Sequence, residues 1–167
     1  MTPRSILSCL ALFATITVPA AELRFAAASV DITPDEPVAL DGQRRVRIAR
    51  NAETPISTTV LALESREGVS VLDQAVIVSC DLVAIRSGIT DQVRAKVRAH
   101  LADLDVDKIV LAATHTAPVT LGGRYTLPAT GITQPAAYAD WMTTRVADAV
   151  VRAWRNRAPG RIGWGQG

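Results

Sequence analysis

Runs of apolar residues along the chain predict four strands. Residues 23–30 and 56–64 are short apolar or β-branched segments with passable alternation, which favours strands. Arg66-Glu67-Gly68 has the composition of the turn that would follow the second of them. Residues 75–80 and 109–113 are continuously apolar, as is typical of strands covered on both faces.

Two segments with helical spacing complete the pattern. Between the last two predicted strands, Thr90 is a suitable N-cap residue for a helix with an apolar stripe at four-residue spacing. A second helix is predicted from Pro135, which suits a first helical turn, to about Trp154. Pro159-Gly160 is expected to end it, and residues 161–164 to begin another strand.

Strand, helix and strand with short connections form a βαβ unit, whose two strands are parallel. The expected fold is therefore an α/β domain with a mostly parallel or mixed sheet and flanking helices. Because the sequence stops on the first residues of a strand, we expect residues 22–167 to be an incomplete N-terminal part of a larger domain.

The first residues have the order of a secretory signal peptide. Arg4 precedes the apolar stretch 6–18, and small residues follow it before Glu22. We predict a signal peptide over residues 1–21, cleaved after Ala20 or Ala21, and an exported, periplasmic or extracellular mature chain. An uncleaved anchor is the alternative interpretation.

The charge of the chain does not favour a nucleic-acid partner, but one local basic run has two possible interpretations. The 167 residues have a net charge of +2, which does not favour nucleic-acid binding. The basic run contains Arg44, Arg45, Arg47 and Arg50, with no aromatic residue among them. A solvated loop or strand edge and a phosphate-binding patch are both open for it.

Candidate chemistry lies where two predicted strands end. Asp81 follows the run that ends at Cys80, and His115 follows the run that ends at residue 113. Ligands of open α/β sheets bind at the carboxyl ends of the strands, so a carboxylate and an imidazole could meet there. His115 fits either a metal ligand or a loop residue with a satisfied hydrogen bond. Cys80 is expected to be a buried structural thiol, and His100 a structural residue.

Several segments resemble the neutral/alkaline non-lysosomal ceramidase family over nearly the whole mature chain. They are Ala27-Ala28-Ser29-Val30-Asp31-Ile32-Thr33-Pro34, Val78-Ser79-Cys80-Asp81-Leu82-Val83-Ala84-Ile85 and Ala113-Thr114-His115-Thr116-Ala117-Pro118, with shorter likenesses at Gln134-Pro135, the helix 145–150 and Gly163-Trp164-Gly165. The resemblance implies a zinc-dependent amide hydrolase that cleaves the N-acyl bond of ceramide. It also implies a lipid or acyl-amide substrate and contact with a membrane surface.

The resemblance also implies roles for particular residues. His115 would be a zinc ligand, Asp81 a supporting acid of the catalytic site, and Thr116 a substrate-binding residue. Zinc would polarise the amide carbonyl and lower the pKa of a bound water. In the family, further ligands, including a Glu and a Tyr, come from much later in the chain.

The sequence departs from the family at one motif. The family has two histidines in Thr-His-Thr-His, whereas one His precedes Ala117-Pro118 here, so which family histidine His115 represents stays open. If it corresponds to the second, the resemblance implies that His115 contacts the substrate and not the metal. The expected function is a secreted ceramidase-type amide hydrolase, incomplete or inactive as this fragment. The alternatives are a non-catalytic exported α/β module that binds a partner or lipid through the strand-end crevice, and a remnant without function.

Overall fold

The computed structural model describes residues 21–42, 44–116 and 125–166. The predicted signal peptide, apart from residue 21, and the expected Ala117-Pro118 segment lie outside these residues. Within the described ranges, no helix is both long and apolar enough to cross a membrane. The elements in chain order are β1 (Glu22–Asp31), β2 (Val38–Leu40), β3 (Arg47–Ala49), β4 (Ser57–Glu67), β5 (Ser70–Cys80), α1 (Ile89–Arg98), η1 (Val106–Lys108), β6 (Ile109–Ala113), α2 (Pro135–Arg155) and β7 (Ala158–Gly160).

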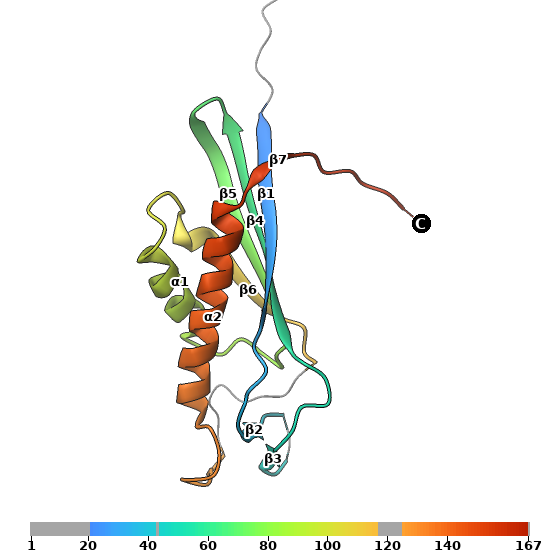
Figure 1. The fold of residues 1–167 in the computed structure, drawn as a ribbon, viewed down its shortest axis with the longest axis vertical. Coiled ribbons are helices and arrows are strands. Elements are labelled where there is room, and N and C mark those ends of the chain that lie inside the picture. Colours follow the sequence, from blue (N-terminus) through green and yellow to red (C-terminus); the bar gives the residue numbers. More distant parts are fainter. Residues whose placement is uncertain (1–20, 43, 117–124, 167) are drawn as a thin grey trace, which may run out of the picture.

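A five-stranded mixed sheet in the order β6-β5-β4-β1-β7 forms the body of the molecule (Figure 1). Strands β5 and β6 are parallel and are joined through α1, while the pairs β5–β4, β4–β1 and β1–β7 are antiparallel. The expected α/β class, mixed sheet and βαβ unit are therefore confirmed. Strands β2 and β3 form a separate small ribbon.

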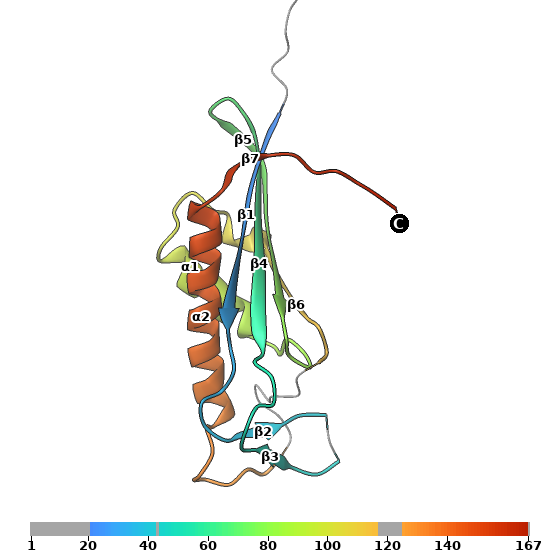
Figure 2. The ribbon, with the colours of Figure 1, turned by 45° about the vertical axis from the view of Figure 1, so that its right-hand side comes forward.

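Both helices lie on one face of the sheet, as Figure 2 shows from the side. The core is built from strand residues that point toward the helices and from the helix stripes that meet them. Its fully buried members include Val60, Ala62, Val76, Val78, Ile109, Val93, Val97, Met142, Val146 and Val150. Burial of these side chains is the main favourable contribution to the free energy of folding.

The other face of the sheet is open in the described part of the chain. Ile77 on β5 is 48% exposed and Val110 on β6 is 58% exposed. The prediction that these two strands are covered on both faces is therefore wrong for the described structure. The continuous apolar runs mark one face turned to the helices and a second apolar face that no described element covers.

Two element boundaries also differ from those predicted. The turn between β4 and β5 lies at Gly68 and Val69, because β4 continues to Glu67 and Gly68 adopts a φ of 58°. Helix α1 begins after Gly88, with a φ of 82°, and not at Thr90. A positive φ is a conformation that glycine adopts without steric cost, so these glycines fix the boundaries.

The residues after α2 correct another expectation. The helix begins at Pro135 as predicted and ends at Arg155. Pro159 and Gly160 then lie in β7, which pairs with the edge of β1, where the missing N–H of proline is tolerated. Residues 161–164, expected to start a strand, have no regular secondary structure and are exposed.

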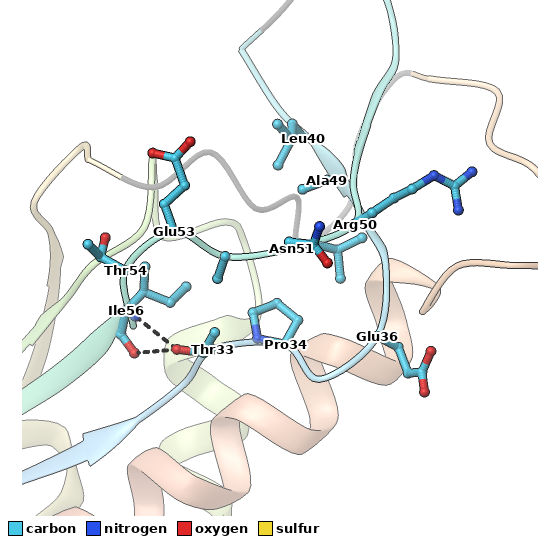
Figure 3. A pocket seen from close by; sticks show the side chains of 12 residues that line it. Thr33, Pro34, Glu36, Leu40, Ala49, Arg50, Asn51, Glu53, Thr54 and Ile56 are labelled. Carbon is cyan, nitrogen blue, oxygen red and sulfur yellow. Dashed lines mark hydrogen bonds between the residues drawn. The ribbon is translucent and has the colours of Figure 1, made fainter.

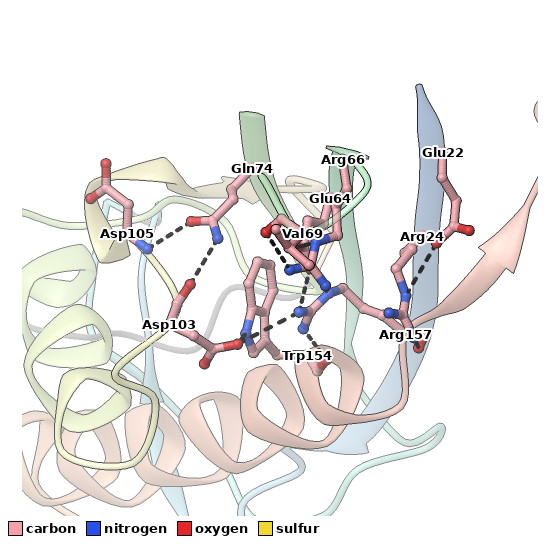
Figure 4. A network of polar contacts seen from close by, with 10 residues as sticks. All are labelled: Glu22, Arg24, Glu64, Arg66, Val69, Gln74, Asp103, Asp105, Trp154 and Arg157. Carbon is pink, nitrogen blue, oxygen red and sulfur yellow. Dashed lines mark hydrogen bonds and ion pairs between the residues drawn. The ribbon is translucent and has the colours of Figure 1, made fainter. Parts of the chain in front are cut away.

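A network of charges fixes the C-terminal end of α2 to the sheet (Figure 4). Glu64 of β4 is only 3% exposed, and its carboxylate pairs with Arg157, whose Nε donates to Oε2 over 2.9 Å. Arg66 forms a second ion pair with Glu64 at 3.0 Å. The Arg157 guanidinium stacks over the Trp154 ring, 3.4 Å from its centroid. A buried carboxylate is tolerated here because two cations compensate its charge.

Candidate functional site

The candidate site lies where β5 and β6 end side by side. In their parallel register Cys80 is opposite Ala113, so the next residues, Asp81 and Thr114, leave the sheet together. Thr114 N also donates to Cys80 O over 2.9 Å. The backbone therefore brings Asp81 and the segment of His115 to the same edge of the sheet, as expected from the sequence.

Asp81 is held as a carboxylate by three hydrogen bonds. Its Oδ2 accepts from the backbone N and from the Oγ of Ser57, each at 3.0 Å. Its Oδ1 accepts from the Thr114 hydroxyl at 3.2 Å. The backbone hydrogen bond from Ser57 is the largest of the effects that lower the pKa of Asp81, and the two hydroxyls add to it against partial burial. Asp81 is thus an anion that links the start of β4 with the ends of β5 and β6.

His115 has an unusual backbone conformation and a fixed ring. Its φ is 65°, in the left-handed region that residues other than glycine seldom adopt. Its backbone N donates to Leu82 O at 2.9 Å, and its ring Nδ1 lies 2.6 Å from Val83 O. Both contacts are to the loop after β5, which therefore holds the imidazole in place. Strained backbone of this kind concentrates at functional sites.

The ring contact determines the tautomer of His115. A carbonyl oxygen only accepts hydrogen bonds, so Nδ1 must carry the proton. In the neutral imidazole, Nε2 then has a free lone pair. The residue is exposed and is therefore not a core histidine, and among the described residues no hydrogen-bond partner contacts Nε2. Histidine ligands of metals usually have this arrangement, with the second nitrogen bonded to a carbonyl or carboxylate.

Thr116 is connected to Asp81 through one intermediate residue. The Thr114 and Thr116 hydroxyl oxygens are 2.7 Å apart, and Thr114 also bonds to Asp81. Both threonines are exposed. The three residues proposed from the sequence therefore lie on two adjoining loops, with Thr114 as the bridge.

Zinc requires more ligands than the described site contains. Catalytic zinc usually has three protein ligands, and the described residues include no group of three His, Cys, Asp or Glu side chains placed to hold a metal. Cys80 is fully buried, and burial raises the pKa of its thiol, so the structure supports its expected structural role. Of the ligands that zinc would need, the described part of the strand-end site therefore offers a single imidazole, that of His115.

Two features of the site were not anticipated from the sequence. Ser57 provides two of the three donors to Asp81, although it lies 24 residues earlier. An ion pair between Arg86 and the buried Asp41 joins the loop after Asp81 to the β2–β3 ribbon. Alternation in residues 56–64 located the strand but could not give the long-range register that brings Ser57 to Asp81.

A partly apolar hollow of about 220 Å³ lies beside this end of the sheet (Figure 3). Thr33 and Pro34 form one side and the β2–β3 ribbon the other, with Leu40, Ala49 and Ile56 among its apolar lining. Thr33 Oγ1 accepts from Ile56 N at 2.9 Å, which fixes that wall. The described lining contains none of Asp81, His115 and Thr116, so the hollow adjoins the strand-end site without being part of it.

Comparison with known proteins places the fold. No protein-family model matches the chain, and no curated protein sequence matches it. Among solved structures, the neutral ceramidase from Pseudomonas aeruginosa matches with a TM-score of 0.65 and 20% identity, over 85% of this chain and 23% of that one. A ceramidase complexed with C2 matches with a TM-score of 0.62 and 19% identity, over 85% of this chain and 22% of that one.

The chain thus spans less than a quarter of the length of these two ceramidases. At this level of identity the match concerns the fold. The resemblance noted in the sequence is confirmed in that sense: the structural neighbours of this mixed α/β chain are neutral ceramidases.

Proposed function

We propose that this chain is part of a zinc-dependent amide hydrolase of the ceramidase type, in which His115 supplies one zinc ligand. The observation that supports this most directly is the contact of 2.6 Å between His115 Nδ1 and Val83 O. In the neutral imidazole it leaves Nε2 without a proton on an exposed ring, as metal ligation requires. The fold shared with two ceramidases adds the substrate class, an N-acylated lipid amide.

Asp81 and Thr116 have supporting roles in this proposal. Asp81 is a positioning residue, because its carboxylate holds the loops that follow β5 and β6 through Ser57 and Thr114. Thr116 presents an exposed hydroxyl one residue from the imidazole, where it could hydrogen-bond to the amide of a substrate. Cleavage of an amide would release a fatty acid and an amine.

In this proposal the chain supplies one zinc ligand, His115, and the strands and loops that position it. The proposal also includes export of the chain through its N-terminal segment. Full turnover needs ligands from polypeptide other than the described residues, so hydrolysis by the chain alone is not its test. Zinc binding by the other histidine, His100, would also be uninformative. The useful experiment therefore compares the two histidines of the sequence, His100 and His115.

Isothermal titration calorimetry of the purified full chain with zinc provides that comparison. We expect weak zinc binding that His115→Ala abolishes and that His100→Ala, the matched control, leaves unchanged. Equal binding by the chain and the His115→Ala variant would contradict the metal-ligand role. It would favour the alternative, a non-catalytic exported module of the same fold.

A further inference from the structure

The β2–β3 ribbon lies at the end of the molecule that holds the candidate site (Figures 1 and 2), and a cluster of arginines lies on and beside it. Arg44, Arg45, Arg47 and Arg50 are all exposed. Lys and Arg exceed Asp and Glu by only 18 to 16 in the whole chain, so this cluster is a local feature and not a reflection of overall charge. We define these four residues as the arginine patch.

Within the described residues, the arginine patch has no internal counterion. No ion pair or side-chain hydrogen bond joins its guanidinium groups to another described residue, in contrast to Arg86, which pairs with Asp41 on the same ribbon. Arg44, Arg45 and Arg47 instead line one hollow together with Val46. Like charges that converge without a carboxylate repel one another, and an external anion would relieve that repulsion.

The surroundings of the patch favour a lipid surface as the source of that anion. Arg50 also lines the neighbouring hollow, which has apolar residues such as Leu40 and Ala49 in its lining (Figure 3). Glu36 and Glu53 line the same hollow, but neither forms an ion pair with Arg50 in the described structure. Cations next to apolar side chains suit the boundary between lipid headgroups and acyl chains. The patch contains no aromatic residue on which nucleic-acid bases could stack, which disfavours a single-stranded nucleic acid.

The ribbon is also connected to the candidate site. The Arg86–Asp41 ion pair joins it to the loop after β5, which positions His115 through Leu82 and Val83. Thr133 N, just before α2, donates to Pro37 O at 2.7 Å just before β2. A surface bound by the arginine patch would therefore lie at the strand-end side of the sheet.

From these contacts we propose that the arginine patch binds the surface of an anionic phospholipid membrane. The interaction is electrostatic and involves headgroup phosphates. It does not require His115 or a metal, and it is therefore independent of the hydrolytic function proposed above.

Vesicle co-sedimentation of the full chain tests the proposal. Vesicles of phosphatidylcholine alone are compared with vesicles that also contain phosphatidylglycerol. Each arginine near an anionic surface contributes about a fivefold increase in partitioning, so Arg44→Gln/Arg45→Gln/Arg47→Gln should weaken binding roughly a hundredfold. High salt should weaken binding by the unsubstituted chain as well.

The matched control removes the same charge elsewhere. Arg98→Gln/Arg155→Gln/Arg161→Gln changes exposed arginines outside the ribbon and should keep most of the binding. The apolar segment 6–18 is present in every variant, so any contribution it makes to vesicle binding is common to all of them. Circular dichroism checks that both triple variants keep the fold.

Further variants separate charge from other effects. Replacing Arg44, Arg45 and Arg47 by Lys should preserve binding, and so should His115→Ala, which separates this proposal from the catalytic one. Equal loss in both triple Gln variants, loss in the Lys variant, or equal binding to neutral vesicles would overturn the proposal. So would displacement by inorganic phosphate at constant ionic strength, or by single-stranded DNA, since either would identify a different ligand.

Discussion

Replacing Asp81 by Asn tests whether the candidate site depends on a carboxylate at the strand ends. The amide keeps the size of the side chain but removes the charge that two Ser57 donors and the Thr114 hydroxyl now stabilise. A hydrogen bond to a charged group contributes about 1.5–3 kcal/mol, and a neutral one about 0.5–1.5 kcal/mol. The two bonds to Oδ2 would together lose about 2 kcal/mol, and partial solvent exposure reduces this to about 1–2 kcal/mol.

The lowered pKa of Asp81 determines how the stability difference between the two proteins depends on pH. Because the pKa of Asp81 is lowered in the folded state, its contribution to stability is present above the unfolded-state pKa of about 3.9. It is lost as the pH falls through the lower folded-state pKa. The free-energy difference between the unsubstituted chain and Asp81→Asn should therefore be largest near neutral pH and should narrow in acid.

Urea unfolding followed by circular dichroism at several pH values measures this difference. Asp35→Asn is the matched control, because Asp35 is exposed and lies in a loop at the same end of the molecule. A constant difference between the Asp81→Asn variant and the unsubstituted chain across the pH range, or a cost no larger than that of Asp35→Asn, would refute the reasoning.

Two other predictions concern how α2 and β7 are fixed to the sheet. Arg157→Met leaves the buried Glu64 with one fewer compensating cation and should lower the free energy of unfolding in urea by about 3 kcal/mol. The double variant Glu64→Gln/Arg157→Met should recover much of that loss, because it removes the uncompensated charge. An equal loss in both variants would contradict the ion-pair account. Gly160→Ala should cost about 1–3 kcal/mol, because a Cβ there would come within 2.8 Å of Phe25 Cζ. Gly163→Ala, with no atom within 4 Å of its added Cβ, should be nearly neutral in the same assay, and an equal loss of unfolding free energy in the two glycine variants would contradict the close packing of β7.

The sequence was sufficient to predict the βαβ unit and the meeting of its strand ends. Apolar runs at residues 75–80 and 109–113 with an amphipathic helix between them leave few alternatives, since parallel strands require a crossover. Such runs do not reveal whether a second layer covers the sheet, and Ile77 and Val110 are exposed in the described structure. The residue types of a strand indicate that one of its faces is apolar, but they do not indicate which element packs against that face.

The features that organise the site depend on contacts between distant segments. His115 was a candidate because it follows a strand, but its left-handed φ and its tautomer depend on the carbonyls of Leu82 and Val83. Ser57 reaches Asp81 through the pairing of β4 with β5. Local periodicity contains no information on these contacts, so the residue types could be proposed from the sequence while their geometry could not.

The protonation of the His115 ring provides the most direct test of the metal-ligand proposal. Nitrogen-15 NMR of the imidazole in the zinc-free full chain distinguishes the two neutral tautomers, and His100→Ala assigns the signals by removing the second ring. We expect the proton on Nδ1, and on addition of zinc a shift of the Nε2 resonance of His115. A proton on Nε2, or an Nε2 resonance unchanged by zinc, would contradict the proposal that this residue binds a metal.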